Sequence, residues 1–292
     1  MRGVVVGLAG IVGLVAASSL AGQESGDPGR PPASFDSLVA VARASSAPYR
    51  DPEAAIAAGY RPLGPDFPGM GRHWINPRLL VEGRVDVSRP PILEYASVDG
   101  QLTLVGVAYA KLVSGDEVPD EFPVDDGAWH FHSGSVDEEG LLRGHEGLEG
   151  SHHTGPRIAL LHAWVWLENP GGLFATDNWA LPFARLGLVP EQGVLPAAAK
   201  ALSLASGGAR FFEAVIRAVG APDSLDLATV RLALERYQAL VDEIRPAAAS
   251  PRRLTAEDLS CLADLWGQLW AEIAGSVSPQ VSDRLRSLVA RQ

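Results

Sequence analysis

The sequence predicts an α+β fold, in which a β-rich antiparallel core, either a sheet or a small barrel, is followed by a helical C-terminal layer or bundle. Two observations support this prediction. Between residues 64 and 190, short runs of β-favouring residues alternate with prolines and glycines, as in antiparallel sheets. After residue 190, apolar residues recur at helical spacing, and prolines separate the segments.

The N-terminal residues have the pattern of a secretory signal peptide. Arg2 precedes an apolar run that ends in small residues near Ala21. We therefore expect residues 1–22 to be a signal peptide and the protein to be secreted or periplasmic, with no stable membrane insertion after cleavage. An uncleaved membrane anchor is the alternative, because the apolar run approaches the length of a membrane span. Gln23 stands where a lipidated cysteine would be needed, which excludes lipidation there.

Residues 23–48 are expected to form a linker and a short helix that begins at Phe35. A second helix is predicted to follow Asp51, because this side chain is a suitable N-cap and Pro52 fits the first helical position. Gly59 suits a left-handed helix end. The β-rich domain, which contains the histidines and most tryptophans, is expected to span residues 49–190, and a helical region residues 191–292.

Four segments of the β-rich domain are the best strand candidates: PPILEYASV (90–98), QLTLVGVAYAKLV (101–113), AWHFHSG (128–134) and RIALLHAWVWLE (157–168). Asp99 and Gly100, between the first two segments, predict a hairpin turn. In the helical region, Thr255 and Asp258 provide capping chemistry for a helix over residues 255–274. The single cysteine, Cys261, lies in that helix and is predicted to be a buried, small apolar side chain.

The overall composition limits the classes of partner. Apolar residues make up 47% and charged residues 20%, as in folded globular proteins. The net charge is −11, with 35 acidic and 24 basic side chains. We expect no nucleic-acid partner, because phosphate binding requires concentrated Lys and Arg.

Two histidines stand one residue apart on the third strand candidate. His130 and His132 project from the same strand face, and Trp129 and Phe131 from the other, which is expected to face the core. A pair of imidazoles so placed can bind a metal ion if a third ligand comes from elsewhere. The alternative is a solvent-facing strand with polar side chains.

Further ligand candidates lie in the same domain, which contains all seven histidines. His162 begins HAWVW, so it is predicted to share one side of a strand with Trp164 and Trp166, where desolvation favours a neutral ligand. A core histidine bound to backbone is the alternative. His73, in GMGRHWINP, and Glu94, an acid in an apolar strand, are the next candidates. The glycine-rich loop with His145, His152 and His153 is interpreted as a solvated loop or a weak surface site.

Several other chemistries lack their motifs. The chain has no Gly-x-Ser-x-Gly segment, no Walker A loop, no Gly-x-Gly-x-x-Gly before a helix and no His-Glu-x-x-His helix. No general base can be identified either. Whether the protein is an enzyme therefore stays open.

Two segments carry a resemblance to a known family. GMGRHWINP and HAWVWLENPGGLFATDNW resemble the GMGxHxxNP and HxWxWxxNPxGxFA segments of a family of uncharacterised secreted bacterial proteins. The similarity covers roughly residues 48–187. It implies secretion but no assigned activity. Relatives often carry acidic residues where this chain has Ala96 and Ala108, which makes Glu94 a possible substitute ligand.

Together, these patterns predict a secreted or periplasmic protein that binds a divalent metal, zinc or copper, through His130, His132 and His162, with His73 and Glu94 as further candidates. A second hypothesis is a metal-free module with a tryptophan-lined pocket for a small ligand. Its candidate residues are Trp74, Trp164, Trp166, Asn76 and Asn178. A third is an envelope protein whose helical region binds a protein partner, with no further cofactor.

Overall fold

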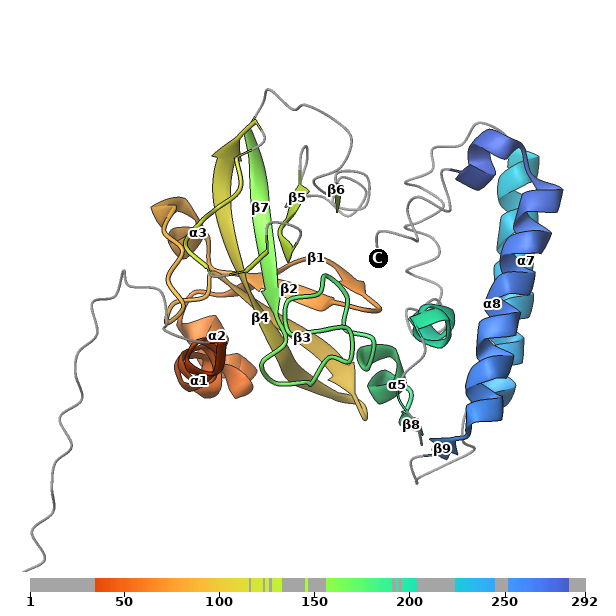
Figure 1. The fold of residues 1–292 in the computed structure, drawn as a ribbon, viewed down its shortest axis with the longest axis horizontal. Helices are drawn as coiled ribbons and strands as arrows, with labels where there is room; N and C mark the ends of the chain where they lie inside the picture. The colour runs from red at the N-terminus through yellow and green to blue at the C-terminus, as the bar shows by residue number, and fades with distance from the viewer. Residues whose placement is uncertain are drawn as a thin grey trace, which may run out of the picture. The chain divides into compact units, whose positions relative to one another are not determined.

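The computed structural model describes residues 35–115, 117–122, 124–125, 128–132, 145–146, 156–190, 193, 196–203, 224–244 and 252–283 (Figure 1). The expected signal peptide and His152 and His153 lie outside these residues. None of the helices in the described part of the chain has the length and apolar character needed to cross a membrane.

Seven strands form one antiparallel sheet in the order β1-β2-β3-β4-β7-β5-β6 (Figure 1). The strands are β1 (Arg61–Phe67), β2 (Gly71–Ile75), β3 (Ile92–Val98), β4 (Gln101–Ser114), β5 (His130–His132), β6 (His145–Glu146) and β7 (Pro156–Ala163). With the C-terminal helices, this sheet confirms the predicted α+β fold. All four strand candidates contain a strand, whereas β1, β2 and β6 were not expected; β6 lies in the glycine-rich segment that was interpreted as a solvated loop.

The helices before the sheet follow the predicted capping chemistry. Helix α1 spans Phe35–Ser46, the 3-10 helix η1 spans Ala47–Arg50 and α2 spans Pro52–Ala57. The carboxylate of Asp51 accepts a hydrogen bond from the backbone N–H of Glu53 at 3.0 Å, as expected of an N-cap. Gly59 takes a φ of 99°, in the left-handed region.

The hairpin between β3 and β4 is confirmed. Asp99 and Gly100 have φ values of 50° and 73°, and the flanking residues Val98 and Gln101 pair directly. Two central residues with positive φ define the tight turn that suits a twisted hairpin.

A bulge interrupts the pairing of the same two strands. Glu94 pairs with Gly106, but Tyr95 pairs with Leu104, so Val105 has no partner across the ladder. The Val105 carbonyl instead accepts the backbone N–H groups of Trp166 and Leu167, at 3.3 and 3.0 Å. These bonds hold residues 166 and 167 beside the bulge, outside the regular ladder, and β7 ends at Ala163 and not at residue 168 as predicted.

The two faces of the sheet have different surroundings. One face packs against α1 and α2 in an apolar core with Trp74, Tyr95, Tyr109, Trp129 and Phe131. The predicted core position of Trp129 and Phe131 is therefore confirmed. The opposite face carries a smaller apolar group centred on Ile92, Ala108, Ala110 and Leu160.

The C-terminal part is helical, as expected. Short helix α5 (Leu181–Arg185) is followed by helical residues 196–203, α7 (Ser224–Ile244) and α8 (Ala256–Ser276). Strands β8 (Leu188–Pro190) and β9 (Arg252–Leu254) form a parallel pair. Thr255 and Asp258 make the predicted capping box.

The prediction for Cys261 is wrong, because its side chain is exposed. Helix α8 buries the stripe formed by Leu259, Leu262, Leu269 and Ile273. Cys261 follows Leu259 by two positions, which places it on another side of the helix.

Candidate metal centre

The strand register brings three potential metal ligands onto one sheet face. His73 on β2 pairs with Glu94 on β3, and Glu94 pairs with Gly106 on β4. His162 on β7 pairs with Ala108, two residues beyond Gly106. Directly opposed residues in antiparallel strands share a face, and so do residues two apart on one strand. The three side chains therefore meet above Gly106 and Ala108.

The ligand atoms of these side chains converge. One potential ligand atom from each of His73, Glu94 and His162 lies within 4.8 Å of the other two. Nε2 of His73 is 3.7 Å from Oε1 of Glu94, and Nδ1 of His162 contacts the same oxygen. The imidazole centroids are 5.5 Å apart. A buried group of this composition could hold a metal ion.

These polar atoms are buried with almost no hydrogen-bond partners. The Glu94 and His162 side chains are fully buried, and that of His73 is 12% exposed. Among the described residues, Nε2 of His73, Oε2 of Glu94 and Nε2 of His162 have no hydrogen-bond partner, and Nδ1 of His162 and Oε1 of Glu94 have only each other. Buried polar atoms nearly always have partners, so such a concentration points to a missing ligand.

Burial also controls the protonation of the group. It raises the pKa of Glu94 well above its ordinary value. Burial lowers the pKa of His162 to about 3, and burial with the nearby His162 and His132 lowers that of His73. In the metal-free site, burial therefore favours a protonated carboxyl and two neutral imidazoles. A neutral imidazole keeps the nitrogen lone pair that a metal needs.

Gly106 makes room for the carboxyl group. A Cβ atom added at this position would overlap Oε2 of Glu94 and lie 3.1 Å from the Trp164 ring. Only glycine leaves this space, because any other residue carries a Cβ. The role of Gly106 could not be predicted from the sequence, because its place opposite Glu94 depends on the strand register, which the residue pattern alone does not show.

The structure brings the predicted ligand candidates onto one sheet face and shows which of them converge. His130 and His132 pair with Leu160 and Ile158, on the same face as His162. His130 stacks on His162, with centroids 4.9 Å apart and an interplanar angle of 21°. The group that converges is nevertheless His73, Glu94 and His162, so the further candidates Glu94 and His73 are members and the His130–His132 pair flanks them.

His73 and Glu94 are direct cross-strand partners, a relation in which Cβ atoms lie about 5 Å apart, whereas His130 and His132 stand two apart on one strand. The rings of His130 and His132 remain neighbours, 5.1 Å apart. Burial, and then His162, lower the pKa of His132 to about 4.

The two tryptophans after β7 diverge, contrary to prediction. Trp164 stacks on His162, with centroids 5.6 Å apart, and its indole N–H donates to the Ala175 carbonyl at 2.6 Å. The indole N–H of Trp166 instead donates to Oγ of Ser46, at 3.0 Å, beside the other core. Trp164 and Trp166 were expected on the same side of one strand, but β7 ends at Ala163, before both of them.

The remaining pocket candidates also lie apart. Trp74 packs on Tyr95 in the core on the opposite sheet face. Asn76 is the N-cap of α3 (Pro77–Glu82), accepting from the N–H of Arg78 at 3.2 Å. Asn178 donates to the Leu167 carbonyl at 2.9 Å. These residues serve packing and local structure, and together with Trp164 and Trp166 they do not line one pocket in the described part of the chain.

Comparison with known proteins gives no match: no family model, curated protein or solved structure is significantly similar to the chain. The resemblance to the uncharacterised secreted family therefore stays a prediction.

Proposed function

We propose that the protein binds one divalent transition-metal ion, zinc or copper, through His73, Glu94 and His162. The observation that carries the proposal is the convergence of their ligand atoms in a buried group without hydrogen-bond partners outside the group among the described residues. A bound ion would give each of these side chains a partner and would supply the positive charge that a buried carboxylate requires.

The chemistry of the ligands supports this choice of metal. Neutral imidazole is a good ligand for zinc and copper, and a carboxylate can complete either site. Three protein ligands on zinc leave a fourth position for water or another small molecule. The proposal is a metal-binding function and does not include a reaction.

We also propose that the protein works outside the cytoplasm, in the periplasm or after secretion. The support is the signal-peptide pattern of residues 1–22. The proposed ligand set contains no thiol. Metal binding by imidazole and carboxylate therefore does not depend on a reducing compartment.

The test is elemental analysis of the full chain purified from the periplasm of an expression host and loaded with equal amounts of zinc and copper. We expect about one equivalent of metal per chain, as structural and catalytic zinc sites hold. A His73→Ala, His162→Ala double variant is expected to lose it. The metal retained by the wild-type protein also distinguishes zinc from copper.

The matched control removes two other histidines, His152→Ala and His153→Ala, in the glycine-rich loop. This variant is expected to keep the metal content of the wild-type protein. If the control loses the metal and the His73, His162 variant keeps it, the loop holds the ion and the proposal is wrong. Circular dichroism of each variant establishes that a loss of metal does not follow from unfolding.

A further inference from the structure

A second site with different chemistry lies beyond the end of β2. The structure has a pocket of about 580 Å³ between the end of α2, the start of α3 and the segment before β3. This volume lies within the range of small-molecule pockets. The lining residues are Tyr49, Ala58, Gly59, Tyr60, Asn76, Pro77, Arg78, Leu79, Ser88, Arg89 and Pro90.

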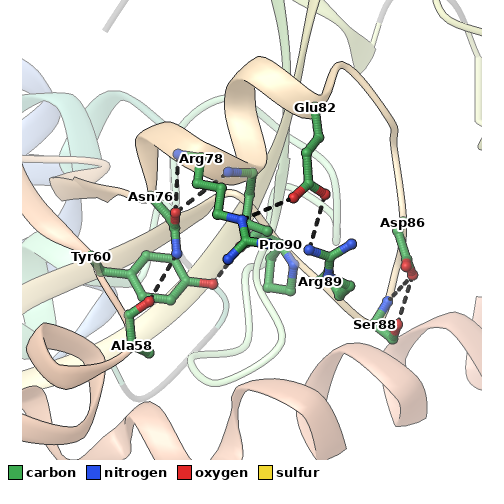
Figure 2. Close-up of polar contacts among 10 residues, drawn as sticks. Ala58, Tyr60, Asn76, Arg78, Glu82, Asp86, Ser88, Arg89 and Pro90 are labelled. Carbon is green, nitrogen blue, oxygen red and sulfur yellow. Dashed lines mark hydrogen bonds and ion pairs between the residues drawn. The ribbon is translucent and has the colours of Figure 1, made fainter.

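Hydrogen bonds between these segments fix the walls of the pocket (Figure 2). The Asn76 side-chain amide donates to the Ala58 carbonyl at 3.1 Å, which ties the start of α3 to the end of α2. The Tyr60 hydroxyl donates to the Pro90 carbonyl at 2.7 Å, which ties the residue before β1 to the segment before β3. A pocket held in this way is formed before a ligand arrives, and preformed pockets lose less entropy on binding.

The lining carries two arginines and no acidic residue. Figure 2 shows Glu82 between them: one oxygen is 3.4 Å from Nε of Arg78 and the other 2.9 Å from Nη2 of Arg89. The Arg78 side chain is 86% exposed and that of Arg89 48%, so one carboxylate bridges two guanidinium groups on the solvent side of the pocket. Each guanidinium has further N–H donors, and within the described residues no acceptor binds them. The nearby Asp86 accepts a hydrogen bond at Oδ1 from the Ser88 hydroxyl, at 2.7 Å.

The rest of the pocket wall is aromatic and apolar. The rings of Tyr49 and Tyr60 lie 5.0 Å apart, and Pro77, Leu79 and Pro90 complete this surface. Two guanidinium groups with unused N–H donors beside an aromatic wall suit an anion that has an apolar part. We propose that this pocket binds a small molecule with an oxyanion head, a carboxylate or a phosphate, on an aromatic or apolar body.

This proposal is independent of the metal site. The pocket shares no lining residue with His73, Glu94 and His162. Because an oxyanion can also coordinate a metal ion, binding is measured on metal-free protein, so that a failure of either proposal can be recognised separately.

The experiment uses the full chain with a chelator and three probes of similar shape: phenyl phosphate, benzoate and the neutral benzamide. Binding is followed by amide NMR spectra and by calorimetry. We expect one or both anions to bind and benzamide not to bind at concentrations up to about 10 mM, a weak-affinity range suited to small fragments. Which anion binds more tightly distinguishes a phosphate from a carboxylate ligand. Shifts are expected at the amides of Gly59, Leu79 and Ser88.

The double variant Arg78→Gln, Arg89→Gln is expected to bind the anion at least about tenfold more weakly than the wild-type protein, because it loses charge-assisted hydrogen bonds. Arg84→Gln removes the same charge from an exposed residue of the same segment that does not line the pocket. It is expected to bind as the wild-type protein does. Equal binding of benzamide, equal loss in both variants, or no binding of either anion would overturn the proposal.

Discussion

At the scale of single residues, Glu94 decides the chemical character of the candidate metal site. It is a fully buried carboxyl between two imidazoles, and the adjacent Gly106 has no side chain. Its acidic character in an apolar strand could be seen in the sequence. Its partners could not, because they come from three other strands and depend on pairing register.

The raised pKa of Glu94 predicts how metal affinity depends on pH. Without metal, the carboxyl keeps its proton above its ordinary value of 4.5. A metal ion displaces this proton, so zinc affinity is expected to increase as the pH rises towards the folded-state pKa of Glu94. Calorimetry in buffers of different ionisation enthalpy measures the released proton. Glu94→Gln is expected to abolish this proton release and to weaken zinc binding about a hundredfold.

The raised pKa of Glu94 also affects the stability of the metal-free protein. Because the folded-state pKa is raised, the contribution of the protonated carboxyl is fully present below about pH 4.5 and is lost as the pH rises through the folded-state value. In the metal-free state, the free energy of unfolding of Glu94→Gln minus that of the wild-type protein should therefore increase between pH 5 and about pH 8. Urea unfolding measures both free energies. If their difference stays constant across this pH range, the raised pKa of Glu94 is contradicted.

Gly106 gives a second residue-scale prediction. Gly106→Ala places a methyl group on the Glu94 carboxyl and should displace it, weakening zinc binding and lowering the free energy of unfolding by about 1–3 kcal/mol. Gly267→Ala is the matched control, since nothing lies within 4 Å of its added Cβ in α8. The control should raise stability by about 0.5–1 kcal/mol. Urea unfolding and zinc titration of both variants measure these effects, and equal behaviour would contradict the prediction.

At the scale of elements, local chemistry was predictable and pairing was not. The N-cap at Asp51, the turn at Asp99 and the capping box at Thr255 follow from a few neighbouring residues, and all three were expected. Strand β1 was missed because Pro62, Gly64 and Pro65 interrupt its pattern. It stands at one end of the strand order, where proline is tolerated, and its ladder with β2 shifts register at these residues.

The segment after β7 gives an element-scale prediction. The Asn169 side chain donates to the Asp177 carbonyl at 2.8 Å and accepts from the N–H groups of Gly171 and Trp179 at 2.9 and 3.0 Å. Asn169→Ala should therefore lower the free energy of unfolding by about 2–3 kcal/mol. Gln101→Ala, at an exposed strand end, should change it little.

The Asn169 variant also separates folding from metal binding. Because this side chain holds the segment and is not a ligand, the folded variant should still bind one equivalent of zinc when the metal is in excess. Chemical denaturation and elemental analysis on the same sample measure the two properties. A variant of wild-type stability that has lost its metal would contradict this division of roles.

At the scale of the whole molecule, one apolar cluster joins the sheet to the C-terminal helices. It includes Phe67 and Trp164 with Tyr237 of α7 and Leu262 of α8. The helical character of the C-terminal region could be predicted from its periodicity. That these helices share a cluster with Trp164, the neighbour of His162, could not be predicted from the sequence. Periodicity identifies the apolar face of a helix but not the surface against which that face packs.

This shared cluster predicts that metal stabilises the sheet and the helices together. Zinc at about a hundred times its dissociation constant should add about 2.7 kcal/mol to the free energy of unfolding. Tryptophan fluorescence and far-ultraviolet circular dichroism should report the same midpoint and the same upward shift. The His73→Ala, His162→Ala variant should show no shift. A shift in one signal only would indicate that the helices unfold independently.

The bulge at Val105 affects how the chain after β7 is held beside His162, but it does not change which residues meet in the candidate metal site. Deleting this one residue would leave Glu94 opposite Gly106 and Tyr95 opposite Leu104, in an uninterrupted ladder. The deletion would remove the carbonyl that binds Trp166 and Leu167, and with it the anchor of the chain beside Trp164. The gain or loss of a single codon can therefore remodel the wall next to His162 while the ligands stay in register. Insertions and deletions, more than substitutions, therefore offer this fold a short evolutionary route to a changed wall beside the proposed metal site.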